Sequence, residues 1–220
     1  MNSNRASRRI LLVRHGSVAA RYKGVCYGRS DVELSDEGRR ESRLVAEELA
    51  ALPMTRLFHS GLSRARLLAE LISALTAVPP IAAPALAEID FGQWELRTWQ
   101  DIFAETGDAM AGMIHSPATF RPPSGETVFE LRDRVLAWHR ELPSDGLIVA
   151  VAHGGSIAAL RGALAGLPAS RWPELIPPHG RWVELDETAN QPARRPLLVD
   201  RAPGDQMDLA SQPRAGESNL

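Results

Sequence analysis

Cysteine is almost absent from this 220-residue sequence, and long apolar runs are absent as well. A single cysteine, Cys26, forms no disulfide within the chain and builds no cysteine-based zinc site. No stretch comes near the roughly 18 uncharged apolar residues that a membrane helix needs, and the run 10–13 behind the basic N-terminus is too short for a secretory signal. The sequence therefore predicts a soluble protein of a reducing cytoplasm, with no membrane partner.

An excess of basic residues is also missing. Lysine and arginine together number 25 against 27 aspartate and glutamate residues, which gives a formal net charge of -2. Proteins that bind nucleic acid through charge usually carry a strong basic excess, so we expect no nucleic-acid partner. With 44% hydrophobic and 24% charged residues, the composition is that of a globular protein. The length suits one α/β domain, and two small domains are the alternative.

Short apolar runs alternate with helical patterns along the chain. Strands are predicted at 9–13, 55–59 and 147–152, with shorter ones near Ile81, at 181–186 and at 197–199. A first helix is predicted between the N-cap Ser35 and Pro53, and a second one contains Leu68, Leu71, Ile72 and Leu75 on one face. Further helices are predicted over 94–114, after a capping box of Thr127 and Glu130, and after His153. This alternation predicts a mostly parallel sheet with helices on both faces.

Two histidines directly follow apolar strands. Arg14-His15-Gly16 comes after ILLV, and His153-Gly154 comes after LIVAVA. In doubly wound sheets the ligand crevice lies at the carboxyl ends of the strands. A lone histidine at such an end is more often structural, but a pair, each followed by a glycine that lets a ligand approach the backbone, favours a site.

Arginines follow the second predicted strand in the same way. Arg64 and Arg66 fall in the first turn of the next helix, where a positive charge is unfavourable. An anionic ligand held between Arg14 and Arg64 would compensate, because guanidinium groups bind phosphate oxygens in pairs. We interpret Arg66 as a surface residue with a solvated head group.

Four motifs occur in an order typical of one family. Arg14-His15-Gly16, SGLSRARLLAE, AEIDFGQWE and VAHGGSIAALRGALAG resemble the histidine phosphatase superfamily, which includes the cofactor-dependent phosphoglycerate mutases. The resemblance covers about residues 8–186. It implies a three-layer α/β/α sandwich of the phosphoglycerate mutase type over 9–186, with a helical lid at about 92–142. The polar composition of 1–8 and of 187–220 predicts a flexible start and a mostly disordered tail.

The resemblance also implies a mechanism. His15 would be the nucleophile that takes the phosphoryl group as a phosphohistidine, and Arg14, Arg64 and His153 would surround that group. Glu88 would act as general acid and then as general base. The resemblance further implies substrate binding at Gly16, Arg21, Gly28 and Gly154. It implies no metal and no cofactor, and a small phosphorylated molecule as the substrate.

Within the family the sequence is most similar to the alpha-ribazole phosphatases. The segments GVCYGRSDVELS, EIDFGQWELRTWQDI, PPSGETVFELRDRV and AGLPASRW carry this likeness. Trp94 and Trp99 would then either line an apolar wall for an aromatic base or pack between helices. The chain departs from many relatives at Ser17, Val18 and Arg21, so the substrate is less well specified than the chemistry.

Other enzyme classes fit the sequence poorly. A cysteine-dependent phosphatase needs an arginine at a fixed spacing after its cysteine, and Val32 is the sixth residue after Cys26. No P-loop motif is present, and the histidines form no HExxH motif. The alternatives that stay open are a broad-specificity phosphatase, a phosphoglycerate mutase-like enzyme, and an inactive relative that binds phosphorylated ligands.

Overall fold

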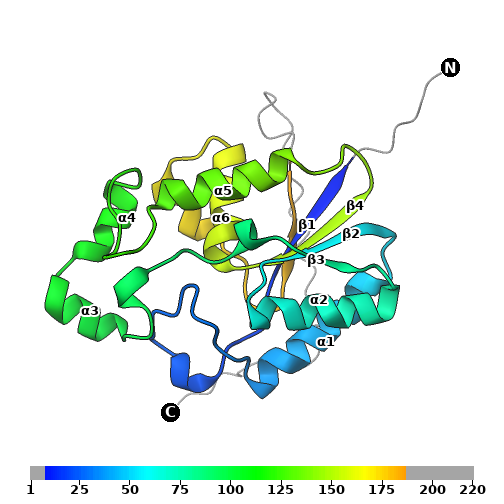
Figure 1. The fold of residues 1–220 in the computed structure, drawn as a ribbon, viewed down its shortest axis with the longest axis horizontal. Helices are drawn as coiled ribbons and strands as arrows, with labels where there is room; N and C mark the ends of the chain where they lie inside the picture. The colour runs from blue at the N-terminus through cyan, green and yellow to red at the C-terminus, as the bar shows by residue number, and fades with distance from the viewer. Residues whose placement is uncertain (1–7, 187–220) are drawn as a thin grey trace, which may run out of the picture.

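One five-stranded sheet forms the centre of the molecule, in the strand order β3-β2-β4-β1-β5 (Figure 1). The computed structural model describes residues 8–186. The strands are β1 (Arg9–Arg14), β2 (Met54–His59), β3 (Pro80–Ala82), β4 (Leu147–Ala152) and β5 (Trp182–Glu184). The pairs β1–β4, β4–β2 and β2–β3 are parallel, and β5 runs antiparallel to β1. The predicted strands within the described residues are therefore confirmed, with ends that differ by a residue or two.

Helices cover both faces of this sheet. They are α1 (Asp36–Ala50), α2 (Ser63–Thr76), α3 (Trp99–Thr106), α4 (Gly112–His115), α5 (Val128–Arg140) and α6 (Gly154–Leu164). Short 3-10 turns lie at Ala20–Tyr22, Pro84–Leu86, Gly92–Trp94, Ala109–Ala111 and Ala169–Leu175. None of the helices in the described range is long and apolar enough to cross a membrane.

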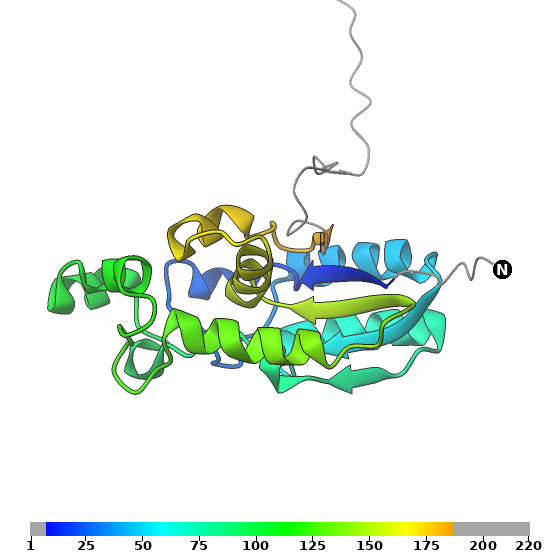
Figure 2. The same ribbon diagram turned by 90° about the horizontal axis from the view of Figure 1, so that it is seen from above.

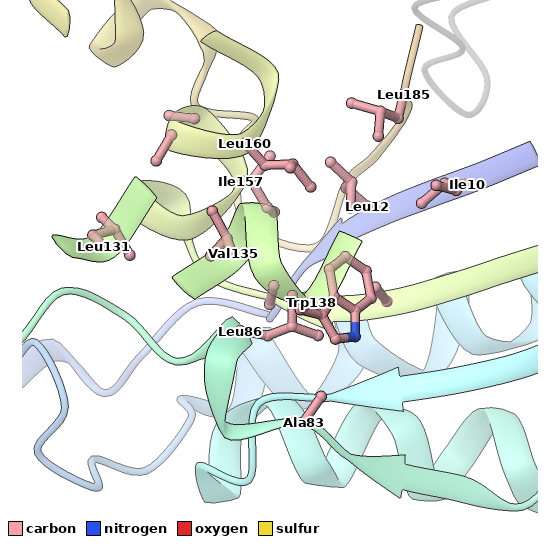
Figure 3. Close-up of a cluster of buried hydrophobic side chains, with 14 of the residues drawn as sticks. Ile10, Leu12, Ala83, Leu86, Leu131, Val135, Trp138, Ile157, Leu160 and Leu185 are labelled. Carbon is pink, nitrogen blue, oxygen red and sulfur yellow. The ribbon is translucent and has the colours of Figure 1, made fainter. Parts of the chain in front are cut away.

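Alternating side chains of the central strands separate two cores. Ile10 and Leu12 of β1 pack with α5 and α6 on one face, where Figure 3 shows the side chains that meet. Leu11 and Val13 pack with α1 and α2 on the other face. Because successive strand residues point to opposite faces, the fully apolar runs of β1 and β4 are buried on both sides. The three-layer α/β/α sandwich is confirmed.

The predicted helix caps are present. Ser35 Oγ accepts a hydrogen bond from the backbone N–H of Gly38 at the start of α1. Thr127 and Glu130 form the reciprocal capping box that begins α5. Both signals lie within four residues of sequence, so local chemistry is enough to set these helix starts.

The single helix predicted over 94–114 is wrong. A 3-10 turn ends at Trp94, α3 starts only after its N-cap Thr98 and ends at Thr106, and α4 follows as one separate turn. A side chain at Gly112 would overlap the ring of Phe120, so the chain is folded back on itself here. Leu75, predicted on the apolar face of its helix, is 56% exposed because it lies in the last turn of α2.

The region predicted as a lid, 92–142, has two parts. Figure 2 shows α3 and α4 lying beyond the carboxyl ends of the strands, outside the sandwich. Leu131 and Val135 of α5, by contrast, belong to the main core against the sheet. Only the α3–α4 part therefore lies outside the sandwich, and a lid over 92–142 stays a prediction. The predictions for residues 1–7, for the tail 187–220 and for a strand at 197–199 fall outside the described residues.

The segment that follows β1 lies directly against α1. A Cβ at Gly16 would overlap the carbonyl oxygen of Gly38, and a Cβ at Gly38 would overlap that of Ser17. Ser35 Oγ also donates to the Ser17 carbonyl at 3.2 Å. Two glycines thus let the backbone after β1 rest on the first turn of α1.

We predict that Gly38→Ala destabilises the protein. Alanine gains about 1 kcal/mol over glycine in a helix, but a Cβ forced into rigid backbone costs about 1–3 kcal/mol or more, so the clash should decide the sign. Urea unfolding measures the difference. Arg39→Ala, at the next and exposed position of α1, is the control and should change the free energy of unfolding by no more than about 0.5 kcal/mol. A Gly38→Ala protein as stable as the wild type would contradict the prediction.

Candidate functional site

The two strand ends singled out from the sequence lie side by side. β1 and β4 are parallel neighbours, and Arg14 pairs with Ala152 in the register. His15, the next residue of the first strand, and His153, the next residue of the second, therefore project from the same edge of the sheet. Their ring centroids are 4.9 Å apart.

His15 is held in one tautomer. Its Nδ1 lies 2.7 Å from the carbonyl oxygen of Gly16, and a carbonyl oxygen only accepts. Nδ1 therefore carries the proton, and Nε2 of the neutral ring has a free lone pair. Burial, together with the positive charges of Arg64 and Arg14, lowers the pKa of His15 well below its usual value. The arrangement provides a neutral imidazole with an unprotonated nitrogen, which is the reactive form of a nucleophilic histidine.

His153 is fully buried and has one occupied ring nitrogen. Its Nε2 lies 2.7 Å from the hydroxyl oxygen of Ser60, which follows β2. Burial lowers the pKa of His153 well below its usual value, and the nearby charges act in the same direction. Nδ1 is buried and has no partner within the described residues. A bound group could therefore pair with this nitrogen.

Two arginines bring positive charge to the histidines, and backbone carbonyls hold both of them. Arg64 is 1% exposed and donates to the carbonyl oxygens of Ser30 at 2.8 Å and Gly28 at 2.6 Å. Arg14 donates from Nη1 to the carbonyl oxygen of Pro177 at 2.9 Å. In each guanidinium group Nε is buried without a partner. Each arginine thus has a free donor for an anion.

The side chain of Glu88, which follows the turn Pro84–Leu86, contacts the first turn of α6. Its Oε2 accepts a hydrogen bond from the backbone N–H of Gly155 at 3.1 Å, and its Oε1 accepts from the N–H of Ile89 at 3.0 Å. A Cβ at position 155 would overlap the carboxylate, so any other residue there would displace Glu88 from this contact. This contact places a carboxylate beside the residue that follows His153 and Gly154.

An ion-pair cluster fixes the backbone that carries Glu88. Arg134 of α5 donates to the carbonyl oxygens of Ala85, Ala87 and Glu88 at 2.6 to 2.9 Å, and its charge is paired with Glu126 at 2.6 Å. Arg29 also pairs with Glu126, at 3.0 Å. Arg29 Nε donates to the Glu88 carbonyl oxygen at 3.3 Å, so two arginines hold the backbone that carries the carboxylate.

The structure brings most of the predicted site residues together. His15, Arg14, Arg64, His153 and Glu88 all border the strand ends of β1 and β4. Of the four further positions, Gly16 binds the His15 ring through its carbonyl oxygen, Gly28 accepts from Arg64, and a Cβ at Gly154 would lie 3.4 Å from Cζ of Arg14.

Arg21 is placed elsewhere. Its exposed side chain pairs with Glu33 and lies over the ring of Tyr22, and a contact of Arg21 with substrate stays a prediction. The two tryptophans support the packing alternative. Trp94 is 3% exposed and packs against Cys26, and Trp99 packs against Phe91 with ring centroids 5.4 Å apart.

Three contributors to the site were missed from the sequence. Ser60 and Arg134 lie within motifs that carry the family resemblance, so their motifs could have signalled them. His179 has no such signal, although its ring lies 5.3 Å from that of His15. Its proximity depends on the pairing of β5 with β1, which no local pattern encodes.

Comparisons with known proteins agree with this geometry. Residues 10–196 match the family described as histidine phosphatase superfamily (branch 1). The chain is 32% identical over 189 residues to a glucosyl-3-phosphoglycerate phosphatase of Mycolicibacterium vanbaalenii, covering 81% of this chain and 84% of that protein. The native structure of a mycobacterial glucosyl-3-phosphoglycerate phosphatase superposes with a TM-score of 0.73 at 30% identity, covering 81% and 89% of the two chains. The alpha-ribazole phosphatase of Shigella flexneri superposes with a TM-score of 0.70 at 25% identity, covering 81% and 90%.

The buried neutral histidines predict a fall in stability at acid pH. The unfolded chain takes up protons near pH 6.5, whereas His15 and His153 stay neutral in the folded protein, so protonation favours unfolding. We expect the free energy of unfolding to decrease from pH 7 to pH 5, with each of these histidines contributing up to about 1.4 kcal/mol per pH unit. Urea unfolding across this range measures the slope.

Two variants make this measurement specific. His15→Leu should flatten the slope, whereas His115→Leu, at an exposed position in α4, should leave it unchanged. Equal stability of the wild type at pH 5 and pH 7 would rule the explanation out.

Proposed function

Because the chain belongs to the histidine phosphatase superfamily and is a phosphoric monoester hydrolase, we propose that it acts through a phosphohistidine at His15. The observation that carries the proposal is the fixed tautomer of His15, whose Nε2 lone pair lies among buried, unpaired donors. In the first step a bond forms between Nε2 and phosphorus, and the bond from phosphorus to the ester oxygen breaks. In the second step water attacks phosphorus, the Nε2–P bond breaks and inorganic phosphate leaves.

Arg14, Arg64 and His153 stabilise the transferring phosphoryl group. In the transition state negative charge is spread over the three equatorial oxygens, and fixed donors that point to these oxygens stabilise it without reorganisation. The two arginine Nε atoms and His153 Nδ1 are the buried, unpaired atoms expected of such donors. The N-terminus of α6 adds a favourable dipole for an anion beside His153.

Glu88 is the proton carrier in this proposal. In the first step it protonates the departing ester oxygen, and in the second step it takes a proton from the attacking water. Support comes from its contact with the N–H of Gly155, which holds the carboxylate next to the phosphoryl-binding histidines. Arg134 is a positioning residue, because it holds the backbone carbonyl of Glu88 rather than the substrate.

We predict a transient, acid-labile phosphoenzyme that disappears in His15→Ala. Removal of the nucleophile should lower kcat by roughly 10⁴-fold or more, since a nucleophile and its partners act as a unit. Acid quenching of a reaction with radiolabelled substrate, followed by isolation of the protein, measures the intermediate. His115→Ala serves as the matched control and should retain the label. Undiminished turnover by His15→Ala would remove the mechanism.

For Glu88→Gln we predict a loss that depends on the leaving group. Hydrolysis of an alkyl phosphate should slow by roughly 10² to 10⁴-fold, because a poor leaving group needs a proton. Hydrolysis of a nitrophenyl phosphate, whose leaving group is already a weak base, should slow much less in the phosphorylation step. Single-turnover kinetics with both esters measure this step directly. Equal losses for the two esters would show that Glu88 is not the general acid.

Two substrate classes compete for this site. The four segments that resemble alpha-ribazole phosphatases favour alpha-ribazole 5′-phosphate as the substrate. A second candidate, glucosyl-3-phosphoglycerate, is favoured by the 32% identity to a phosphatase named for that substrate. The burial of Trp94 removes one of the two aromatic side chains proposed to contact a nucleotide-like base. Side-by-side kcat/KM values for both compounds, 3-phosphoglycerate and a generic aryl phosphate decide between these substrates, a broad-specificity phosphatase and a phosphoglycerate mutase-like enzyme.

A further inference from the structure

Buried polar atoms without a partner concentrate at one place in the described part of the chain. Of five such side-chain atoms, Trp138 Nε1 lies in the apolar core. The other four belong to Arg14, Arg64, His153 and His179. Native proteins rarely leave such groups unpaired, so a cluster of them indicates a site whose ligand supplies the missing partners. Three of these residues already belong to the proposed phosphoryl site, and His179 does not.

The backbone fixes His179 beside His15. The hydrogen bonds between β1 and β5 continue beyond the N-terminal end of β5. Arg14 N–H donates to the Arg181 carbonyl oxygen at 2.9 Å, and Gly180 N–H donates to the His15 carbonyl oxygen at 3.0 Å. Arg14 Nη1 holds the carbonyl oxygen of Pro177 on the other side. The His179 ring thus has backbone anchors before and after it, with its centroid 5.3 Å from that of His15.

We propose that His179 is a substrate-binding residue, whose Nε2–H donates a hydrogen bond to an oxygen of the phosphoryl group that His15 receives. This inference rests on the proposed function, because it places His179 at the same phosphoryl group. A phosphoryl oxygen is an acceptor, and it would satisfy Nε2 of His179 together with the two arginine Nε atoms.

The charges around His179 keep it neutral. Arg14 and His15 face it from the end of β1, Arg64 from α2, and Glu41 from α1. Burial and the two arginines lower the pKa of His179 to about 4, although Glu41 acts in the opposite direction. At neutral pH the ring adds a hydrogen-bond donor without adding a third positive charge next to the two arginines.

Binding of inorganic phosphate to the full chain tests the proposal. Phosphate has no leaving group, so its affinity reports on the phosphoryl site alone. Isothermal titration should show a Kd raised about tenfold or more for His179→Leu, which lacks a donor. His179→Gln, whose amide can donate from a similar position, should stay within a few-fold of the wild type. His115→Leu, the same change at an exposed position, should leave the Kd unchanged.

Thermal unfolding separates binding from packing. Without phosphate, His179→Leu should unfold at or above the Tm of the wild type, because it removes an unpaired buried polar atom. With phosphate, the wild type should gain more in Tm than the variant, since the stabilisation by a ligand grows with the logarithm of 1 + [phosphate]/Kd. His179→Met, another side chain without a donor, repeats the comparison if the leucine variant does not fold.

The outcomes of this test and those for His15 are independent. Wild-type phosphate affinity in His179→Leu or His179→Met would overturn the inference, and His179 would then be a packing residue. If the phosphoenzyme still disappears in His15→Ala, the proposed function stands. A phosphoenzyme that persists in His15→Ala would instead overturn the proposed function, whatever His179 contributes to the affinity.

Discussion

The parallel pairing of β1 with β4 is the constraint on which the rest of the site depends. This register ends both strands at the same level, with Arg14 opposite Ala152, and so delivers two histidines to one edge of the sheet. Each strand is buried on both faces, so a one-residue slip of either one would move its side chains into the opposite core and disrupt the packing there. One pair of strands therefore determines both the packing of the two cores and the positions of the two histidines.

The manner in which the arginines are held explains how cations persist beside buried histidines. Arg64 and Arg14 bond to backbone carbonyl oxygens, which have partial charge but no net charge. Carboxylates in the same places would neutralise the guanidinium groups and compete with a phosphoryl group. The carboxylate of Glu126 pairs with a different arginine, Arg134. Arg134 in turn donates to the backbone carbonyl oxygen of Glu88. The separation leaves the two guanidinium groups beside the histidines without a carboxylate partner in the described part of the chain, while the segment that carries Glu88 is held.

Local signals in the sequence were enough wherever the determinants lie close together along the chain. The capping box at Thr127 and the apolar run of β4 were predicted correctly because each depends on its own neighbours. The helix over 94–114 was predicted wrongly. Large apolar side chains indicate that a segment is buried, but they do not show whether it forms one continuous helix. His179 could not have been found in this way, since its position arises from pairing between segments from opposite ends of the described chain. Arg21 is assigned by resemblance, and its side chain pairs with Glu33, so a contact with substrate stays a prediction.

The two outer strands have a consequence for how copies of this chain meet one another. β3 and β5 have three residues each, whereas the inner strands have six. β3 also begins with Pro80, which has no N–H to offer. Short borders of this kind present few free backbone groups to a neighbouring chain, which limits aggregation through sheet extension. The long, strongly apolar strands that carry the reactive groups are thus shielded in the folded protein from edge-to-edge association.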